Sequence, residues 1–266
     1  MENLNTFTDE YGVVYSANKK RLIKAPDTLT RYNIPQGTEI IERKAFNNHW
    51  HLKEITFPST LVTIGKRAFE ACWGIDTPIV LSDSVTELEP YCFSFCSHTP
   101  SITFGRNLKI ISAEHLACCS RLREIIIPEE NPYLRFVDGV LFNKEMTELI
   151  YYLEGQKRKV YNVPRSVEVI RESAFCFCDH LREVVLPENV KKIKLHAFMG
   201  CEKLSHVVLP AGITHIAGDV FTDCGKLTVI EVPFGTKERI ASMLPEWADK
   251  IIEKKTSTQY CYEETT

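Results

Sequence analysis

The amino-acid sequence predicts an α/β solenoid: repeats of about 23 residues that stack a parallel β-sheet on one face, with short helical turns opposite and two β-hairpin insertions. Two observations lead to this fold class. A block of the form IxxxAFxxCxxL recurs, and its aromatic or leucine position is Phe46, Phe69, Phe93, Leu116, Phe175, Phe198 and Phe221. A run of the form LxxIxLP follows most blocks, as in residues 181–187. A fixed period of this length is typical of solenoids.

The first expected element is an N-terminal hairpin and cap over residues 1–35. Residues 12–24 contain two short apolar segments around the polar turn ANKK, and residues 139–152 repeat that pattern around NKEMT. Apolar segments joined by a short polar turn are typical of β-hairpins. We therefore expect a second hairpin as an insertion over residues 131–164.

Each repeat is expected to contribute one short strand, in a first repeat block over residues 36–130 and a second over residues 165–233. In LREVVLP (181–187) the fourth and sixth residues are apolar and flank one outward residue, which is the period of a strand with one buried face. Proline has no N–H for the next ladder bond and ends the strand. Prolines at this position are Pro35, Pro58, Pro128, Pro164, Pro187, Pro210 and Pro233.

Between the strands, four-residue segments such as RKAF and ESAF are too short for a full helix and predict a helical turn on the far side from the sheet. Beyond residue 233 the period changes, and apolar residues recur at helix-like spacing: Ile240, Leu244, Trp247, Ile251 and Ile252. We expect residues 234–266 to form a C-terminal cap and a loose polar tail. No linker-like stretch separates the blocks, so one continuous solenoid is expected.

Two interpretations are open for the cysteines, including those in ESAFCFCDHL (172–181). Stacked repeats would place thiols in vertical ladders, as small apolar groups with a weak donor: Cys72, Cys96 and Cys119, then Cys178, Cys201 and Cys224. Alternatively, soft ligands could bind a metal or act in redox chemistry: Cys118, Cys119, Cys176 and Cys178, with His180 nearby. Neighbouring repeats have no second Cys or His at a ligand interval. We therefore favour the ladders and expect no cofactor.

The unit LxxIxLPxxVxxIxxxAFxxCxx, the GVL(F/Y) hairpins and the ending VPFGTKERI resemble the bacterial BspA-like leucine-rich repeat family over about residues 9–253. The resemblance implies a leucine-rich-repeat solenoid that binds other proteins. It also implies that members are often exported, cell-surface adhesins that attach to host matrix proteins or to other cells. The fourth unit departs from the pattern, since His115 and Leu116 replace Ala and Phe.

Composition and short motifs limit the kinds of binding partner, cellular location and activity that we expect. The net charge of −3 gives no electrostatic reason to expect nucleic acid, and no apolar run is long enough to cross a membrane. The first 25 residues lack a basic start followed by an apolar stretch, so a cytoplasmic protein is expected. An exported cell-surface adhesin, whose leader is missing from this sequence, is the alternative. No GxSxG, glycine-rich phosphate loop or HExxH motif is present, and we expect no enzyme.

Another protein is therefore the expected partner, bound on the concave sheet face. Stacking in register aligns the central outward residues of the strands: Thr56, Val80, Thr103, Ile126, Val185, Val208 and Glu231. The apolar members Val80, Ile126, Val185 and Val208 are candidate contact residues. Alternatively, β-branched residues are there because they suit a pleated strand.

Trp50 and Trp73 occupy equivalent places in adjacent repeats and should be neighbours on one edge. They are either interface anchors or a local cluster that shields the N-terminal coils. Charged residues flank the candidate face, either as a solvated surface or as a pattern that selects a partner: Lys53, Glu54, Arg123, Glu124, Arg182 and Glu183.

Overall fold

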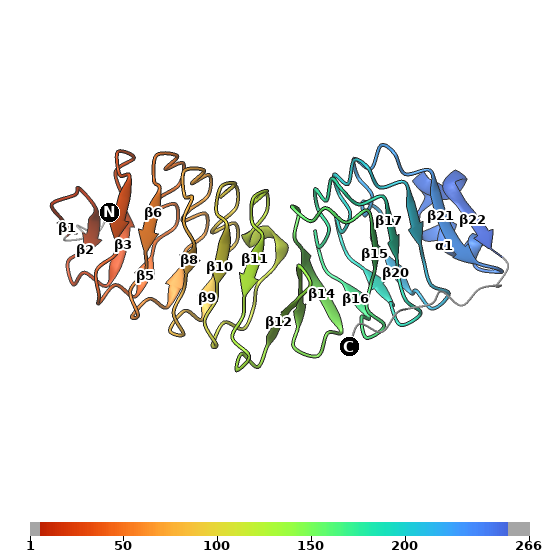
Figure 1. The fold of residues 1–266 in the computed structure, drawn as a ribbon, viewed down its shortest axis with the longest axis horizontal. Coiled ribbons are helices and arrows are strands. Elements are labelled where there is room, and N and C mark those ends of the chain that lie inside the picture. The colour runs from red at the N-terminus through yellow and green to blue at the C-terminus, as the bar shows by residue number, and fades with distance from the viewer. Residues whose placement is uncertain (1–5, 255–266) are drawn as a thin grey trace. The chain divides into compact units, whose positions relative to one another are not determined.

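The structure, a computed structural model, describes residues 6–254 (Figure 1). The chain separates into two compact units. The first contains the chain up to Lys144 together with Leu153–Gly155, and the second contains Glu145–Tyr152 and the chain from Gln156 onward. The predicted repeat boundaries and the predicted continuity of the solenoid stay predictions. The predicted loose tail falls on residues 255–266, outside the described residues.

Parallel strands from successive coils pair in two ladders within the first unit (Figure 1). One ladder is divided into two separate sheets: β4 (Arg31–Asn33) with β6 (Glu54–Thr56), and β8 (Ile79–Val80) with β10 (Ser101–Thr103) and β11 (Glu124–Ile126). The other contains β3 (Arg21–Lys24), β5 (Ile40–Ile41), β7 (Thr63–Ile64) and β9 (Glu87–Leu88). Sequence analysis missed this second ladder because most of its strands are two residues long, too short to show a period.

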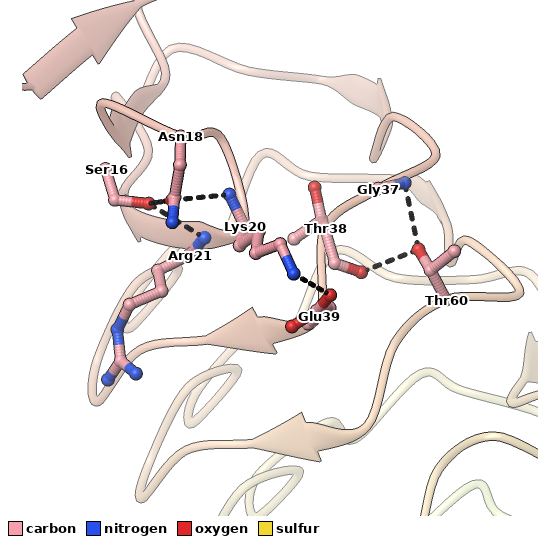
Figure 2. Close-up of polar contacts among 8 residues, drawn as sticks. All are labelled: Ser16, Asn18, Lys20, Arg21, Gly37, Thr38, Glu39 and Thr60. Atoms are coloured by element: carbon pink, nitrogen blue, oxygen red, sulfur yellow. Dashed lines mark hydrogen bonds and ion pairs between the residues drawn. The ribbon is translucent and has the colours of Figure 1, made fainter.

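The N-terminal end of the second ladder is an antiparallel extension, β1 (Thr6–Thr8) and β2 (Val14–Ser16), with β2 paired to β3. Figure 2 shows the polar contacts of the turn between β2 and β3. Ser16 Oγ donates to Asn18 Oδ1 at 2.7 Å, and the same oxygen accepts the N–H of Lys20 at 3.1 Å. The Lys20 ammonium reaches Glu39 in the next coil at 2.7 Å. These bonds hold the turn in one conformation.

The 131–164 insertion contains a hairpin formed by β12 (Leu134–Val137) and β13 (Val140–Asn143). Its two-residue turn is Asp138 and Gly139, whose φ values are 51° and 77°. Positive φ at both central residues is typical of the hairpin turn whose twist matches the strands. An Asp-Gly pair adopts it at low cost because Gly has no Cβ.

The second unit also has two parallel ladders. They are β14 (Glu148–Tyr152), β16 (Val169–Ile170), β18 (Lys192–Ile193) and β20 (His215–Ile216), and β15 (Val160–Asn162), β17 (Glu183–Val185), β19 (His206–Val208), β21 (Val229–Pro233) and β22 (Ile251–Lys254). The cap contains α1 (Lys237–Met243) and η2 (Pro245–Lys250).

Strand β22 corrects one expectation. Ile251 and Ile252 were expected at helical spacing, but they belong to a strand parallel to β21. Pro245 starts a new short helix at the point where α1 ends, so the helical period does not continue to residue 252. An extended segment then pairs with the backbone of β21, which would otherwise be an open sheet edge.

Turns rather than regular helices occupy most of the segments where helical turns were expected. One 3₁₀ helix, η1 (Ala113–His115), is found there among the described residues. Elsewhere, residues with left-handed φ interrupt the helical path, as at Ser173 (55°) and Phe177 (58°). A left-handed residue costs about 1–2 kcal/mol. Bonds between coils offset that cost, such as Phe177 N–H to Met199 O at 2.9 Å.

The core of each unit contains a column of phenylalanines at the predicted positions. Phe46, Phe69 and Phe93 are fully buried and stack with ring centroids 4.8 and 5.4 Å apart. In the second unit, Phe198 lies between two other phenylalanines, with near-parallel rings. Phe175 is 4.8 Å and Phe221 is 5.5 Å away. Near-parallel rings at these distances add to the stabilisation that burial provides.

Candidate protein-binding surface

The ladder cysteines lie inside the coils, next to the phenylalanines. All six are buried, and in five the thiol donates to the carbonyl oxygen of the phenylalanine 26 or 27 residues earlier, at 2.9–3.3 Å: Cys72, Cys96, Cys119, Cys201 and Cys224. Cys178 is also buried, with its thiol 3.9 Å from Tyr152 O. These five thiols therefore provide a hydrogen-bond donor to a backbone carbonyl oxygen of the preceding coil.

These thiols are poorly suited to chemistry. Burial raises the pKa of Cys72 to about 12, so its reactive thiolate form is scarce at neutral pH. His180, the nearby residue in the metal interpretation, is exposed. Within residues 6–254 no group of three or more His, Cys, Asp or Glu side chains is arranged to hold a metal ion.

The candidate face in the first unit is the outward side of β8, β10 and β11. Ile79, Ile102 and Ile125 of these strands are in register and point into the core. The alternate residues form one outward row, Val80, Thr103 and Ile126, also in register. We call this the outer row of the first unit. Val80 is 57% and Ile126 is 41% exposed.

The corresponding row of the second unit is different. It contains Asn162, Val185, Val208 and Glu231 in register. Val185 was predicted to be an accessible contact residue, and this is wrong, because its side chain is only 3% exposed. Its strand, β17, lies inside a five-stranded sheet, whereas Val80 and Ile126 are on the two end strands of theirs. Neighbours on both sides therefore cover Val185. Val208 is half-buried.

Polar and acidic side chains and one lysine occupy the rest of that second face. His206 Nδ1 lies 3.7 Å from Glu183 Oε1, and its Nε2 lies 3.5 Å from Glu231 Oε2. The Lys254 ammonium contacts the same Glu231 oxygen at 3.2 Å, and the Glu231 side chain is almost fully buried. Sequence analysis placed Glu231 in the row but missed Lys254, because the strand that brings it there was not predicted.

The two exposed tryptophans of the first unit line one hollow. Trp50 and Trp73 are 58% and 52% exposed. They border a space of about 160 Å³ together with Lys53, Gly74, Asp76 and His98. Lys53 directly precedes β6, so the hollow lies where the outward face begins. We call it the tryptophan hollow.

The charged flank is mostly accessible. Lys53, Arg123, Glu124 and Arg182 are exposed, while Glu54 and Glu183 are half-buried. Arg123 also donates to Ser120 O at 3.0 Å. Exposed charged side chains add little to folding stability, so the flank does not explain the fold.

Comparisons with known proteins agree with this architecture. The BspA type leucine-rich repeat region matches in six copies over residues 24–137 and 151–244, more than half of the chain. No curated protein matches the sequence. Within residues 6–254 we find no helix with the length and apolar character needed to cross a membrane.

Solved structures with a similar fold come from bacterial repeat proteins. The pneumococcal vaccine antigen PcpA is similar with a TM-score of 0.61 and 20% identity, over 96% of this chain and 72% of PcpA. A leucine-rich repeat protein from Eubacterium ventriosum is similar with a TM-score of 0.56 and 15% identity, over 96% of each chain. The repeat match and this shared architecture lead to one conclusion: the chain belongs to the BspA-type leucine-rich repeat family.

Proposed function

We propose that this chain is a non-enzymatic scaffold that binds another protein through the outward sheet face of its first unit. The observation that supports this most is the outer row, where Val80 and Ile126 present apolar side chains to water in register on a regular sheet. Stacked coils produce an extended, rigid surface of this kind, and repeat proteins use it for binding. A rigid surface loses little conformational entropy on association.

The tryptophan hollow supports the same unit. Trp50 and Trp73 expose large aromatic surfaces around a space that a partner side chain could fill. Tryptophan is enriched among residues that contribute most to interface affinity. Lys53 and Asp76 lie at the hollow with opposite charges. They would form a polar rim that affects association rate and specificity.

The face of the second unit is a weaker candidate. Its central Val185 is buried, and Glu231 is already paired with Lys254 and lies near His206. Burying these charges under a partner would remove their remaining water, which is costly unless new pairing is very good. We therefore assign binding to the first unit and leave Val208 outside the proposed site.

The test compares three variants in affinity capture from cells of the source organism, with bound proteins identified by mass spectrometry. Val80→Asp combined with Ile126→Asp should remove a partner that the unaltered protein retains, and Trp73→Ala should reduce its recovery. Leu195→Asp is the matched control, because Leu195 is also an exposed aliphatic residue but belongs to the second unit. Circular dichroism must show that all variants are folded. Undiminished capture by the double variant would refute the proposed face.

A second candidate is the same binding activity displayed on the cell surface, as an adhesin. It is supported by the similarity of fold to PcpA, which is described as a pneumococcal vaccine antigen. Labelling of intact cells with an antibody against the purified chain would support this location. Labelling that requires permeabilised cells would support the cytoplasmic alternative.

A further inference from the structure

A cavity of about 420 Å³ lies at the N-terminal end of the first unit. Residues of β1, β2 and β4 line it, together with the turns that follow β1 and β2. Its volume falls in the range of about 300–1,000 Å³ that is usual for small-molecule sites. Four aromatic side chains face it: Phe7, Tyr11, Tyr15 and Tyr32. None of them belongs to the outer row or the tryptophan hollow.

The floor of the cavity is rigid. Tyr15 and Tyr32 are buried, and their hydroxyl groups lie 2.5 Å apart. The Tyr32 hydroxyl donates to Asp9 Oδ2 at 2.5 Å. Asp9 Oδ1 accepts the backbone N–H groups of Tyr11 at 2.9 Å and Val13 at 2.8 Å. Both tyrosine hydroxyls and both carboxylate oxygens therefore have partners within the protein.

The rings are arranged as walls. Tyr11 and Tyr32 are nearly perpendicular, at 77°, with centroids 5.8 Å apart. Phe7 and Tyr15 are tilted by 44° and are 6.5 Å apart. Phe7 and Tyr11 are exposed, so they form the rim above the buried floor. Electron-rich ring faces attract cations that approach them.

One ammonium group already occupies a ring face at the rim. Lys19 Nζ lies 3.9 Å from the centroid of the Phe7 ring. Lys19 has a left-handed φ of 58°, in the turn that Ser16 and Asn18 hold (Figure 2). The turn therefore presents this lysine from a fixed backbone. The residues that line the cavity include two acids, Asp9 and Glu10, and Lys19 supplies one positive charge.

We propose that this cavity binds a methylated ammonium group, such as the trimethylammonium group of choline or of trimethyl-lysine. A primary ammonium donates up to three hydrogen bonds, but the Asp9 carboxylate already accepts three bonds from protein donors and has about one acceptor position left. A trimethylammonium group needs no acceptor. It packs its methyl groups against aromatic faces while its charge interacts with the rings. The nearby acids add a favourable longer-range field.

The experiment is an NMR titration of the isotope-labelled full chain with choline chloride and, separately, with 3,3-dimethylbutan-1-ol, which has the same shape without the charge. Saturable shifts around the cavity are expected for choline and much weaker ones for the alcohol. Tyr11→Ala should weaken choline binding about two- to thirty-fold, the loss of one cation–π contact. Lys19→Met should tighten it, because the competing ammonium is gone.

Tyr133→Ala is the control, an exposed tyrosine outside the cavity that should bind choline like the unaltered chain. A trimethyl-lysine peptide and phosphatidylcholine vesicles, tested in parallel, distinguish a peptide from a lipid source of the group. Equal binding of choline and the neutral alcohol would overturn the proposal. Unchanged affinity in a folded Tyr11→Ala variant, or absence of any saturable shift, would do the same.

Discussion

Truncation of Phe198 to alanine would test whether the phenylalanine column stabilises the second unit. Phe198 is fully buried between Phe175 and Phe221, with centroid distances of 4.8 and 5.5 Å. Removing the ring leaves a space that the two neighbouring coils cannot close, because hydrogen bonds fix their separation on both sides. One of these is Phe198 N–H to Val220 O, at 3.0 Å.

The expected cost can be worked from this geometry. A buried Phe→Ala change costs about 3–5 kcal/mol through lost burial and the residual cavity. Each ring pair contributes about 0.5–1.5 kcal/mol beyond burial, and Phe198 takes part in two pairs. We therefore expect a loss near the upper end, about 5 kcal/mol. A natural domain has only about 5–15 kcal/mol of total stability, so the second unit should lose about a third of its free energy of unfolding or more.

Urea unfolding followed by circular dichroism measures the change, and hydrogen exchange detected by mass spectrometry locates it. Peptides covering β17–β20 should lose protection, while those covering β5–β9 of the first unit should keep it. Phe234→Ala is the control, since Phe234 is 66% exposed and its truncation should cost less than about 1 kcal/mol. If Phe198→Ala and Phe234→Ala gave the same midpoint, the column would not be what stabilises the coils.

Three further changes test other parts of the fold. Gly74→Ala should destabilise the first unit by about 1–3 kcal/mol in thermal unfolding, because the new Cβ would lie 2.6 Å from the carbonyl oxygen of Leu52. Gly218→Ala has open space around the new methyl group and should be close to neutral, and equal costs would contradict this reasoning. Cys72→Ala removes a thiol that donates to Phe46 O at 3.1 Å and should cost about 1–2 kcal/mol in urea unfolding, whereas a gain in stability would argue against a structural thiol. Burial raises the pKa of the Cys72 thiol from its usual 9.0 to about 12, so the folded chain holds the thiol proton more tightly than the unfolded chain does. The contribution of the protonated thiol to the free energy of unfolding is therefore complete below pH 9. Above pH 9 the free energy of unfolding of the unaltered protein should fall relative to Cys72→Ala, by about 1.4 kcal/mol per pH unit up to pH 12; parallel curves would show that this thiol is not protected.

Sequence alone was sufficient for the parts of the fold that repeat. The 23-residue period and the alternation in each LxxIxLP run predict stacked parallel strands, and the family match supports that prediction. A side chain such as Phe198 or Cys201 recurs at the same place in most coils, so its neighbours in those coils are copies of itself at known spacing. The position of such a residue in the repeat therefore already specifies its neighbours in the folded chain, which is why the columns could be predicted.

Tertiary structure decided what does not repeat. Val80 and Val185 are equivalent in sequence, yet one is exposed and the other buried, because one is on an end strand and the other is inside a wider sheet. β17 is an inner strand because β15 and β19 pair with it on its two sides. The sheet is extended further by β22, which pairs with β21, an arrangement that the helix-like spacing of residues 240–252 concealed.

The aromatic cavity also depends on tertiary structure. Asp9 and Tyr32 lie in segments with no common motif, yet both line one cavity and their side chains are hydrogen-bonded at 2.5 Å. A periodic sequence determines the contacts between equivalent residues one coil apart. Contacts at the ends of a stack join non-equivalent residues, and only the folded chain specifies them.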